Sequence, residues 1–149
     1  MDATKPAAAV VVSGEVERPL RVDPRELSGW AEREVCIDFH CLEGWSRLGE
    51  QYRGVSLAAL LRRAGARAEG RWVTIASGAY TVVLSREEAE DERVVLAFEL
   101  DGQPLSGLRL VGPSEWDCFR SVKAVDRVEL THEAEEATGP GIARARVGR

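Results

Sequence analysis

Apolar and polar residues alternate along much of this chain, and a period of two is typical of half-buried β-strands. Residues 35–41 show the pattern clearly, since alternation would place Cys36 and His40 on one face and Cys41 on the other. Comparable β-branched or alternating stretches cover residues 10–16, 72–76, 80–84, 94–100, 105–111 and 122–130. Strands should therefore dominate the fold.

Helices are predicted at three points between these strands, each beginning at a residue that caps helix N-termini well. Residues 54–65 have the apolar spacing of an amphipathic helix, with Ser56 as the N-cap and Gly65 ending it. Asp23 and the proline after it predict a short helix, and the capping-box spacing of residues 85–88 predicts another. A chain of 149 residues is long enough for one hydrophobic core and too short for two, so one domain is expected.

Composition narrows the classes of partner and the compartment. The formal net charge of -5 argues against a general nucleic-acid binder. No stretch approaches the roughly twenty apolar residues of a membrane-spanning helix, and residues 1–9 show no export signal. We therefore expect a cytoplasmic protein with no nucleic-acid or membrane partner, in which the three cysteines are thiols or ligands.

Cys41 is the first candidate for chemistry, because a thiolate at the end of a strand, just before a glycine-containing loop, can be presented into a cleft. The competing interpretation is a buried apolar cysteine, since free cysteine is among the most buried residue types. A zinc site made of Cys36, His40 and Cys41 is disfavoured, because strand alternation points Cys41 away from the other two. The same geometry argues against a nucleophile–base pair of Cys41 and His40.

Six segments, in order along the chain, resemble motifs of the oxidoreductase molybdopterin-binding family, whose fold is of the sulfite oxidase type. The segments are FHCLEGWS at 39–46, YRGVSL at 52–57, SGAYT at 77–81, VLAFELDGQPL at 95–105, RLVGP at 109–113 and RSVK at 120–123. The resemblance covers residues 10–131, leaving 1–9 as an N-terminal extension and 132–149 as a flexible C-terminal tail. It implies an α+β fold of mixed, twisted β-sheets with short peripheral helices around a cofactor cleft, and the strand-rich pattern agrees with that.

The resemblance also implies a metal site. In the family a cysteine is the only protein ligand of a molybdenum atom that also carries the two dithiolene sulfurs of molybdopterin, and soft thiolate suits such a centre. Cys41 is therefore the implied metal ligand and a catalytic residue. His40, at the strand end beside it, is expected to donate a hydrogen bond in the cofactor site. Tyr80 matches a tyrosine close to the metal and is the second implied catalytic residue, with packing on the sheet as its structural alternative.

A cofactor-phosphate site is implied further along the chain. Arg120, Ser121 and Lys123 match the segment that holds the pterin phosphate, and a guanidinium, a hydroxyl and an ammonium suit a dianion. The structural alternative for these three residues is a solvated strand entrance. Arg109 is expected to be an ion-paired strand residue and not a ligand.

The chain departs from the family pattern around the implied cofactor. An arm before the first strand of larger members is expected to be missing, residues 105–108 shorten a loop, and two carboxylates occupy residues 115–119. One hypothesis is a molybdopterin-dependent oxidoreductase that performs two-electron oxygen-atom transfer on a small substrate other than sulfite, with a separate electron-transfer protein. The alternative is a non-catalytic homologue that has lost the cofactor and binds a ligand or a protein.

Overall fold

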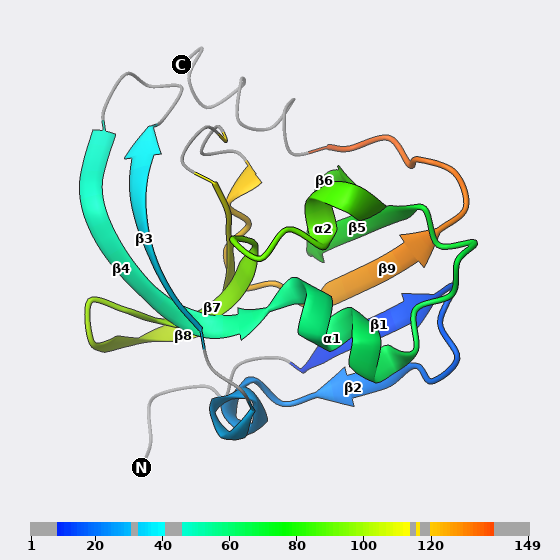
Figure 1. Ribbon diagram of the computed structural model, residues 1–149, viewed down its shortest axis with the longest axis horizontal. Helices are drawn as coiled ribbons and strands as arrows, with labels where there is room; N and C mark the ends of the chain where they lie inside the picture. Colours follow the sequence, from blue (N-terminus) through cyan, green and yellow to red (C-terminus); the bar gives the residue numbers. More distant parts are fainter. Residues whose placement is uncertain (1–8, 31–32, 41–45, 114–115, 117–119, 139–149) are drawn as a thin grey trace.

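Two β-sheets form the domain, together with a few short helices, of which α1 lies near the centre of the view (Figure 1). The computed structural model describes residues 9–30, 33–40, 46–113, 116 and 120–138, and within these it describes only the backbone of residue 28 and of residues from 33 to 48. In Figure 1 the four-stranded sheet lies at the left and the five-stranded sheet at the right. Mixed sheets with few short helices confirm the predicted α+β fold.

The five-stranded sheet has the order β2-β1-β9-β5-β6, in which β1 and β9 are parallel and the other neighbours are antiparallel. Its strands are β1 (Val10–Gly14), β2 (Leu20–Val22), β5 (Trp72–Ser77), β6 (Tyr80–Ser85) and β9 (Arg127–Thr131). The two strands predicted at residues 72–76 and 80–84 are β5 and β6, and they form a hairpin with Ser77 paired to Tyr80 at its closed end. This hairpin positions one of the candidate catalytic residues.

The four-stranded sheet is antiparallel throughout, in the order β3-β4-β7-β8. Its strands are β3 (Arg33–His40), β4 (Ser46–Ser56), β7 (Val95–Leu100) and β8 (Gln103–Val111). β4 is not predicted from the sequence, and residues 54–56 belong to it instead of to the predicted helix. Its sequence, SRLGEQYRGVS, lacks regular alternation and contains two glycines. Gly54 is required there, because a Cβ atom would lie 2.1 Å from the Leu96 carbonyl oxygen where β4 crosses close to β7.

All three predicted helices are present, and their caps are those expected. The helices are η1 (Pro24–Gly29, a 3₁₀-helix), α1 (Leu57–Ala64) and α2 (Arg86–Ala89). At α1 the Ser56 hydroxyl accepts a hydrogen bond from the Ala59 amide at 3.2 Å, and Gly65 ends the helix with a φ of 69°. Within the described residues, no helix is long and apolar enough to cross a membrane.

A main hydrophobic core joins the two sheets and α1, and a second, smaller cluster lies on the other side of the four-stranded sheet. Residues of β7 alternate between the two, since Leu96 belongs to the main core whereas Val95 and Ala97 belong to the second cluster with Tyr52 and Val111. The four-stranded sheet is therefore packed on both faces.

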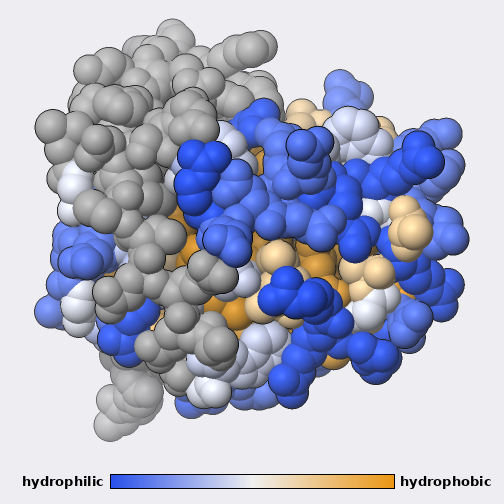
Figure 2. Space-filling model, viewed as in Figure 1, coloured by the Kyte–Doolittle hydropathy of each residue, from blue (hydrophilic) through white to orange (hydrophobic). Residues whose placement is uncertain are grey.

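Hydrophilic side chains cover most of the described surface visible in Figure 2, as expected for a chain with 30% charged residues.

The strand predicted for residues 122–130 forms only from Arg127 onward. Ala124 has a φ of 53°, in the left-handed region that interrupts a strand. Val122 and Val125 are buried in the main core, and the Val122 carbonyl accepts from Leu110 at 2.9 Å while the Val125 amide donates to Leu108 at 2.8 Å. The segment with the candidate phosphate ligands thus runs as an irregular turn along β8.

Candidate active site

The predicted metal ligand belongs to the connection between β3 and β4. β3 ends at His40, whose backbone pairs with Ser46 at the start of β4. Cys41 is therefore the first residue after β3 in the connection between two antiparallel neighbours. Cys41 itself and the side chain of His40 lie outside the described residues, so their assigned roles stay predictions.

Tyr80 begins β6, directly after the turn of the β5–β6 hairpin. Val82 and Leu84 on the same strand are buried in the main core, and strand alternation places Tyr80 on that same side. The ring is half-buried and packs against the main core. Tyr80 therefore combines a fixed ring with some remaining exposure, as either interpretation of this residue requires.

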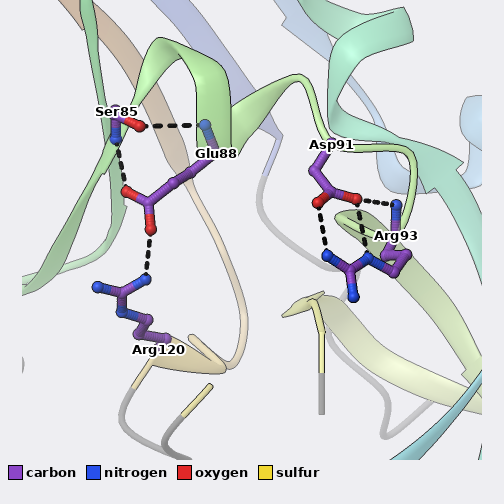
Figure 3. Close-up of polar contacts among 5 residues, drawn as sticks. All are labelled: Ser85, Glu88, Asp91, Arg93 and Arg120. Carbon is purple, nitrogen blue, oxygen red and sulfur yellow. Dashed lines mark hydrogen bonds and ion pairs between the residues drawn. The ribbon is translucent and has the colours of Figure 1, made fainter. Parts of the chain in front are cut away.

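Arg120 is tied to the first turn of α2 by an ion pair (Figure 3). Its Nη1 atom lies 2.8 Å from Oε2 of Glu88, and the other Glu88 carboxylate oxygen accepts from the Ser85 amide at 2.9 Å. The Ser85 hydroxyl in turn accepts from the Glu88 amide at 3.0 Å, which completes a capping box. The Arg120 guanidinium also lies 5.3 Å from the centre of the Trp116 ring. Arg120 thus connects α2 to the segment that precedes β9.

The Glu88 carboxylate is held in its ionised form by these contacts. Partial burial alone would raise the pKa of Glu88, but the Ser85 amide and the Arg120 guanidinium outweigh it and lower the pKa below its ordinary value. Any phosphate that reaches Arg120 must therefore compete with a carboxylate that is ionised at neutral pH. The contact occupies one terminal nitrogen of a group with five N–H donors.

Trp116 packs closely over the backbone that follows β8. A Cβ atom on Gly112 would lie 2.5 Å from the Trp116 ring, so only glycine allows this approach. The ring is partly buried against the main core and has Arg120 near it. One residue of the 115–119 stretch, which departs from the family pattern, is thus an integral part of the packing around Arg120.

Ser121 joins a second arginine to this region. The Ser121 hydroxyl donates to the Leu110 carbonyl at 2.8 Å and accepts from Nε of Arg109 at 2.9 Å. The Arg109 guanidinium also lies 6.0 Å from the centre of the buried Tyr52 ring. The predicted ligand set does not include Arg109. Its place in the RLVGP segment, two residues before buried Val111, puts both side chains on the face of β8 that carries the second cluster.

The predicted phosphate residues are thus brought together in part. Arg120 pairs with the Glu88 carboxylate, and Ser121 accepts from Arg109. Lys123 is exposed. Among the described residues, no group of three or more His, Cys, Asp and Glu side chains could hold a metal ion. Cys41, which lies outside those residues, remains the predicted metal ligand.

Comparisons with known proteins bear on the fold and on the family. The sequence pattern of the family described as "Oxidoreductase molybdopterin binding domain" matches residues 4–138. The chain belongs to this family. The match confirms the resemblance found in the six motifs, and it begins before residue 10 and ends after residue 131.

Two relatives illustrate the extent of the similarity. "Uncharacterized oxidoreductase YuiH" of Bacillus subtilis (strain 168) is 29% identical over 128 residues, which cover 82% of this chain and 64% of the relative. The solved structure of the sulfane dehydrogenase SoxCD from Paracoccus pantotrophus matches with a TM-score of 0.81 and 24% identity, over 93% of this chain and 41% of that one. The structural likeness shows the molybdopterin-domain fold, and this chain spans only part of either relative.

Proposed function

We propose that this chain is a molybdopterin-dependent oxidoreductase domain that performs two-electron oxygen-atom transfer on a small substrate, with Cys41 as the protein ligand of molybdenum. The observation that carries the proposal is the family match over residues 4–138, which spans Cys41, Tyr80 and the segment from Arg120 to Lys123. Cys41 supplies the soft thiolate that such a metal prefers.

The chemistry of the donor set fits the phosphate of the pterin. Arg109, Arg120 and Lys123 contribute three positive charges on β8 and on the turn beside it, and Ser121 contributes a hydroxyl. Guanidinium groups pair well with phosphate because their planar fork of N–H donors can bond two phosphate oxygens at once. When bound, the cofactor supplies a metal centre that exchanges an oxygen atom and two electrons with the substrate.

Tyr80 is the residue proposed to act on the substrate. Its phenol is both a donor and an acceptor of hydrogen bonds, so it can hold the oxygen atom that is transferred. The ring packs against the main core, and its backbone is placed by the closed end of the β5–β6 hairpin. Cys41 and Tyr80 then have separate roles, the first toward the metal and the second toward the substrate.

The proposed reaction needs an electron-transfer partner. If the substrate is oxidised, water provides the oxygen atom, two protons are released, and two electrons pass to a separate haem or flavin protein. If a sulfoxide is reduced, the same partner supplies two electrons, and the oxygen leaves as water with two protons. The solved relative is named a dehydrogenase, which supports a reaction with an electron acceptor.

Metal and pterin analysis tests the proposal. The chain is produced in a host that makes molybdopterin, and molybdenum and pterin are measured per chain for the wild type and for Cys41→Ser. Cys36→Ser and Cys118→Ser are matched controls, since they are the other two cysteines of the chain. We expect about one molybdenum per chain in the wild type and in both controls, and a strong loss of metal in Cys41→Ser.

Two outcomes would contradict the proposal. Sub-stoichiometric molybdenum in the wild type as well as in Cys41→Ser would favour the non-catalytic homologue. Equal molybdenum in the wild type and Cys41→Ser would reject Cys41 as the ligand.

A further inference from the structure

The residues on both sides of Tyr80 are bound to a residue from the C-terminal end of the described chain. The Thr138 hydroxyl donates to the Ala79 carbonyl and accepts from the Thr81 amide at 2.9 Å. The Thr138 amide also donates to the Thr81 hydroxyl at 2.9 Å. Thr138 thus holds the peptide groups immediately before and after Tyr80, although it lies 57 residues beyond Thr81.

The other side of the same turn is held by Asp126, just before β9. Its carboxylate accepts from the Gly78 amide at 2.9 Å, and its own amide donates to the Ala76 carbonyl at 2.9 Å. Gly78 has a φ of 57°, a left-handed backbone conformation that glycine adopts readily. The hairpin end is therefore fastened by two segments that are distant in sequence.

These contacts involve a segment without regular secondary structure. The chain turns back after β9 and runs toward the β5–β6 hairpin, where Thr138 meets it (Figure 1). Residue 138 is also the last one in the family match. Hydrogen bonds from such a segment are not needed to form the hairpin, whose strands pair along their whole length.

Small displacements of a catalytic side chain reduce the rate strongly, so the residues that fix its backbone matter for catalysis. Tyr80 has no strand residue before it within β6 and lies next to the turn. Its ring direction therefore depends on how firmly the turn is held. Two hydrogen bonds with the Thr138 hydroxyl limit the rotation of the peptides that flank Tyr80. A third, from the Thr138 amide to the Thr81 hydroxyl, ties the same two segments together.

We infer that Thr138 is a positioning residue for Tyr80, which it holds by clamping Ala79 and Thr81. The catalytic consequence rests on the proposed function, in which Tyr80 acts on the substrate. The clamp itself is a statement about the protein without its cofactor, and it can be tested in that form.

Fluorine NMR provides the test, because the chain has only two tyrosines. Incorporation of 3-fluorotyrosine gives one resonance for Tyr80 and one for Tyr52, whose complete burial makes it an internal reference. Thr138→Val removes the hydroxyl and keeps the shape, whereas Thr138→Ser keeps the hydroxyl. Thr131→Val is the matched control, since the Thr131 hydroxyl bonds the Glu133 carbonyl at 2.6 Å and has no part in the clamp.

In Thr138→Val we expect the Tyr80 resonance to narrow and move toward that of free fluorotyrosine, while the Tyr52 resonance stays in place. The Thr81 amide should exchange with solvent about fivefold faster, as expected from the loss of one hydrogen bond. Thr138→Ser and Thr131→Val should both resemble the wild type. In the cofactor-loaded protein, Thr138→Val should lower kcat with KM and molybdenum content unchanged, and Thr138→Ser should restore kcat.

An unchanged Tyr80 resonance in Thr138→Val would overturn the inference, as would an equal shift of the Tyr52 resonance, which would indicate general loosening. A shifted Tyr80 resonance with an unchanged kcat at full molybdenum content would overturn the positioning role. Failure of the proposed function has a different signature, because molybdenum would then be missing from the wild type while the NMR result stands.

Discussion

Two ion pairs near α2 use the same kinds of group but connect different parts of the molecule (Figure 3). Asp91 and Arg93 are two residues apart, and their pair closes the turn that leads into β7. Glu88 and Arg120 are 32 residues apart, and their pair connects α2 with the turn before β9. The first contact is determined by local sequence, whereas the second exists only because the fold brings its partners together.

The two pairs also differ in geometry, and the pair with more contacts is the one that is farther from the candidate phosphate ligands. Asp91 contacts two nitrogens of Arg93, at 3.1 and 2.9 Å, and accepts from the Arg93 amide at 2.9 Å. Glu88 contacts Arg120 through a single nitrogen at 2.8 Å. The several contacts between Asp91 and Arg93 stabilise a turn, whereas the single contact between Glu88 and Arg120 occupies a candidate phosphate ligand. For phosphate binding, we therefore expect the position of an ion pair in the fold to matter more than the number of its contacts.

Among the changes near the two ion pairs, removal of the Trp116 ring beside Arg120 should have the largest effect on stability. Trp116→Ala deletes a partly buried ring that packs on Gly112 and lies near Arg120. We expect a loss of about 2 kcal/mol in the free energy of unfolding, below the roughly 3–5 kcal/mol typical of fully buried aromatic rings. Denaturant unfolding measures the change, and a loss under about 0.5 kcal/mol would show that the ring does not support this region.

Neutralisation of Glu88 tests the long-range pair without breaking the helix cap. Glu88→Gln keeps an oxygen for the capping box, so its main effect is loss of the charge that faces Arg120. We expect a loss of about 0.5 kcal/mol in stability and about threefold tighter binding of inorganic phosphate, because Arg120 no longer has a competing carboxylate. Calorimetric titration with phosphate provides the measurement, and weaker binding in the variant would contradict Arg120 as a phosphate ligand.

The pH dependence of the two carboxyl groups distinguishes the pairs further. The pKa of Glu88 is lowered, so its stabilising contribution is present above the ordinary glutamate pKa and is lost as the pH falls through the lowered value. In Arg120→Met we expect the pKa of Glu88 to rise, since the guanidinium is gone. The pKa of Asp91, which is lowered mainly by hydrogen bonds with Arg93, should not change. NMR titration of both carboxyl groups checks this, and a parallel rise of both values would disprove the independence of the pairs.

The smallest effect is expected for the local pair. Asp91→Asn keeps an oxygen that can accept from the Arg93 amide, and it removes a surface charge and the acceptor that faces Nη2 of Arg93. Stability should change by less than about 0.5 kcal/mol, and phosphate binding should equal that of the wild type. A change in phosphate affinity as large as that of Glu88→Gln would show that the effect is one of general charge.

The outcome of the sequence-based predictions follows the same division between local and tertiary causes. The capping residues Ser56, Asp23 and Ser85 act within a few residues of themselves, and the helices that they predict are present. β4 is not predictable from its polar, glycine-containing sequence, because pairing with β3 and β7 stabilises it.

The candidate site shows this limit more strongly. Motifs identify Tyr80 and Arg120 as candidates, but no local pattern indicates that Glu88 faces Arg120 or that Thr138 clamps the hairpin. The late start of β9, at Arg127 instead of residue 122, likewise accompanies the burial of Val122 and Val125 on either side of Ala124, whose φ is 53°. Partners that are distant in sequence thus account for what the motifs could not predict.

The most direct test of the account is the number of sulfur atoms bound to molybdenum. X-ray absorption spectroscopy at the molybdenum edge, on protein purified with its cofactor, counts the sulfur neighbours of the metal. We predict that the wild type and Cys36→Ser share the same count, consisting of the two dithiolene sulfurs and one cysteine thiolate, and that Cys41→Ser retains one sulfur fewer on its residual metal. An equal sulfur count in the wild type and Cys41→Ser would contradict the central claim that Cys41 binds molybdenum.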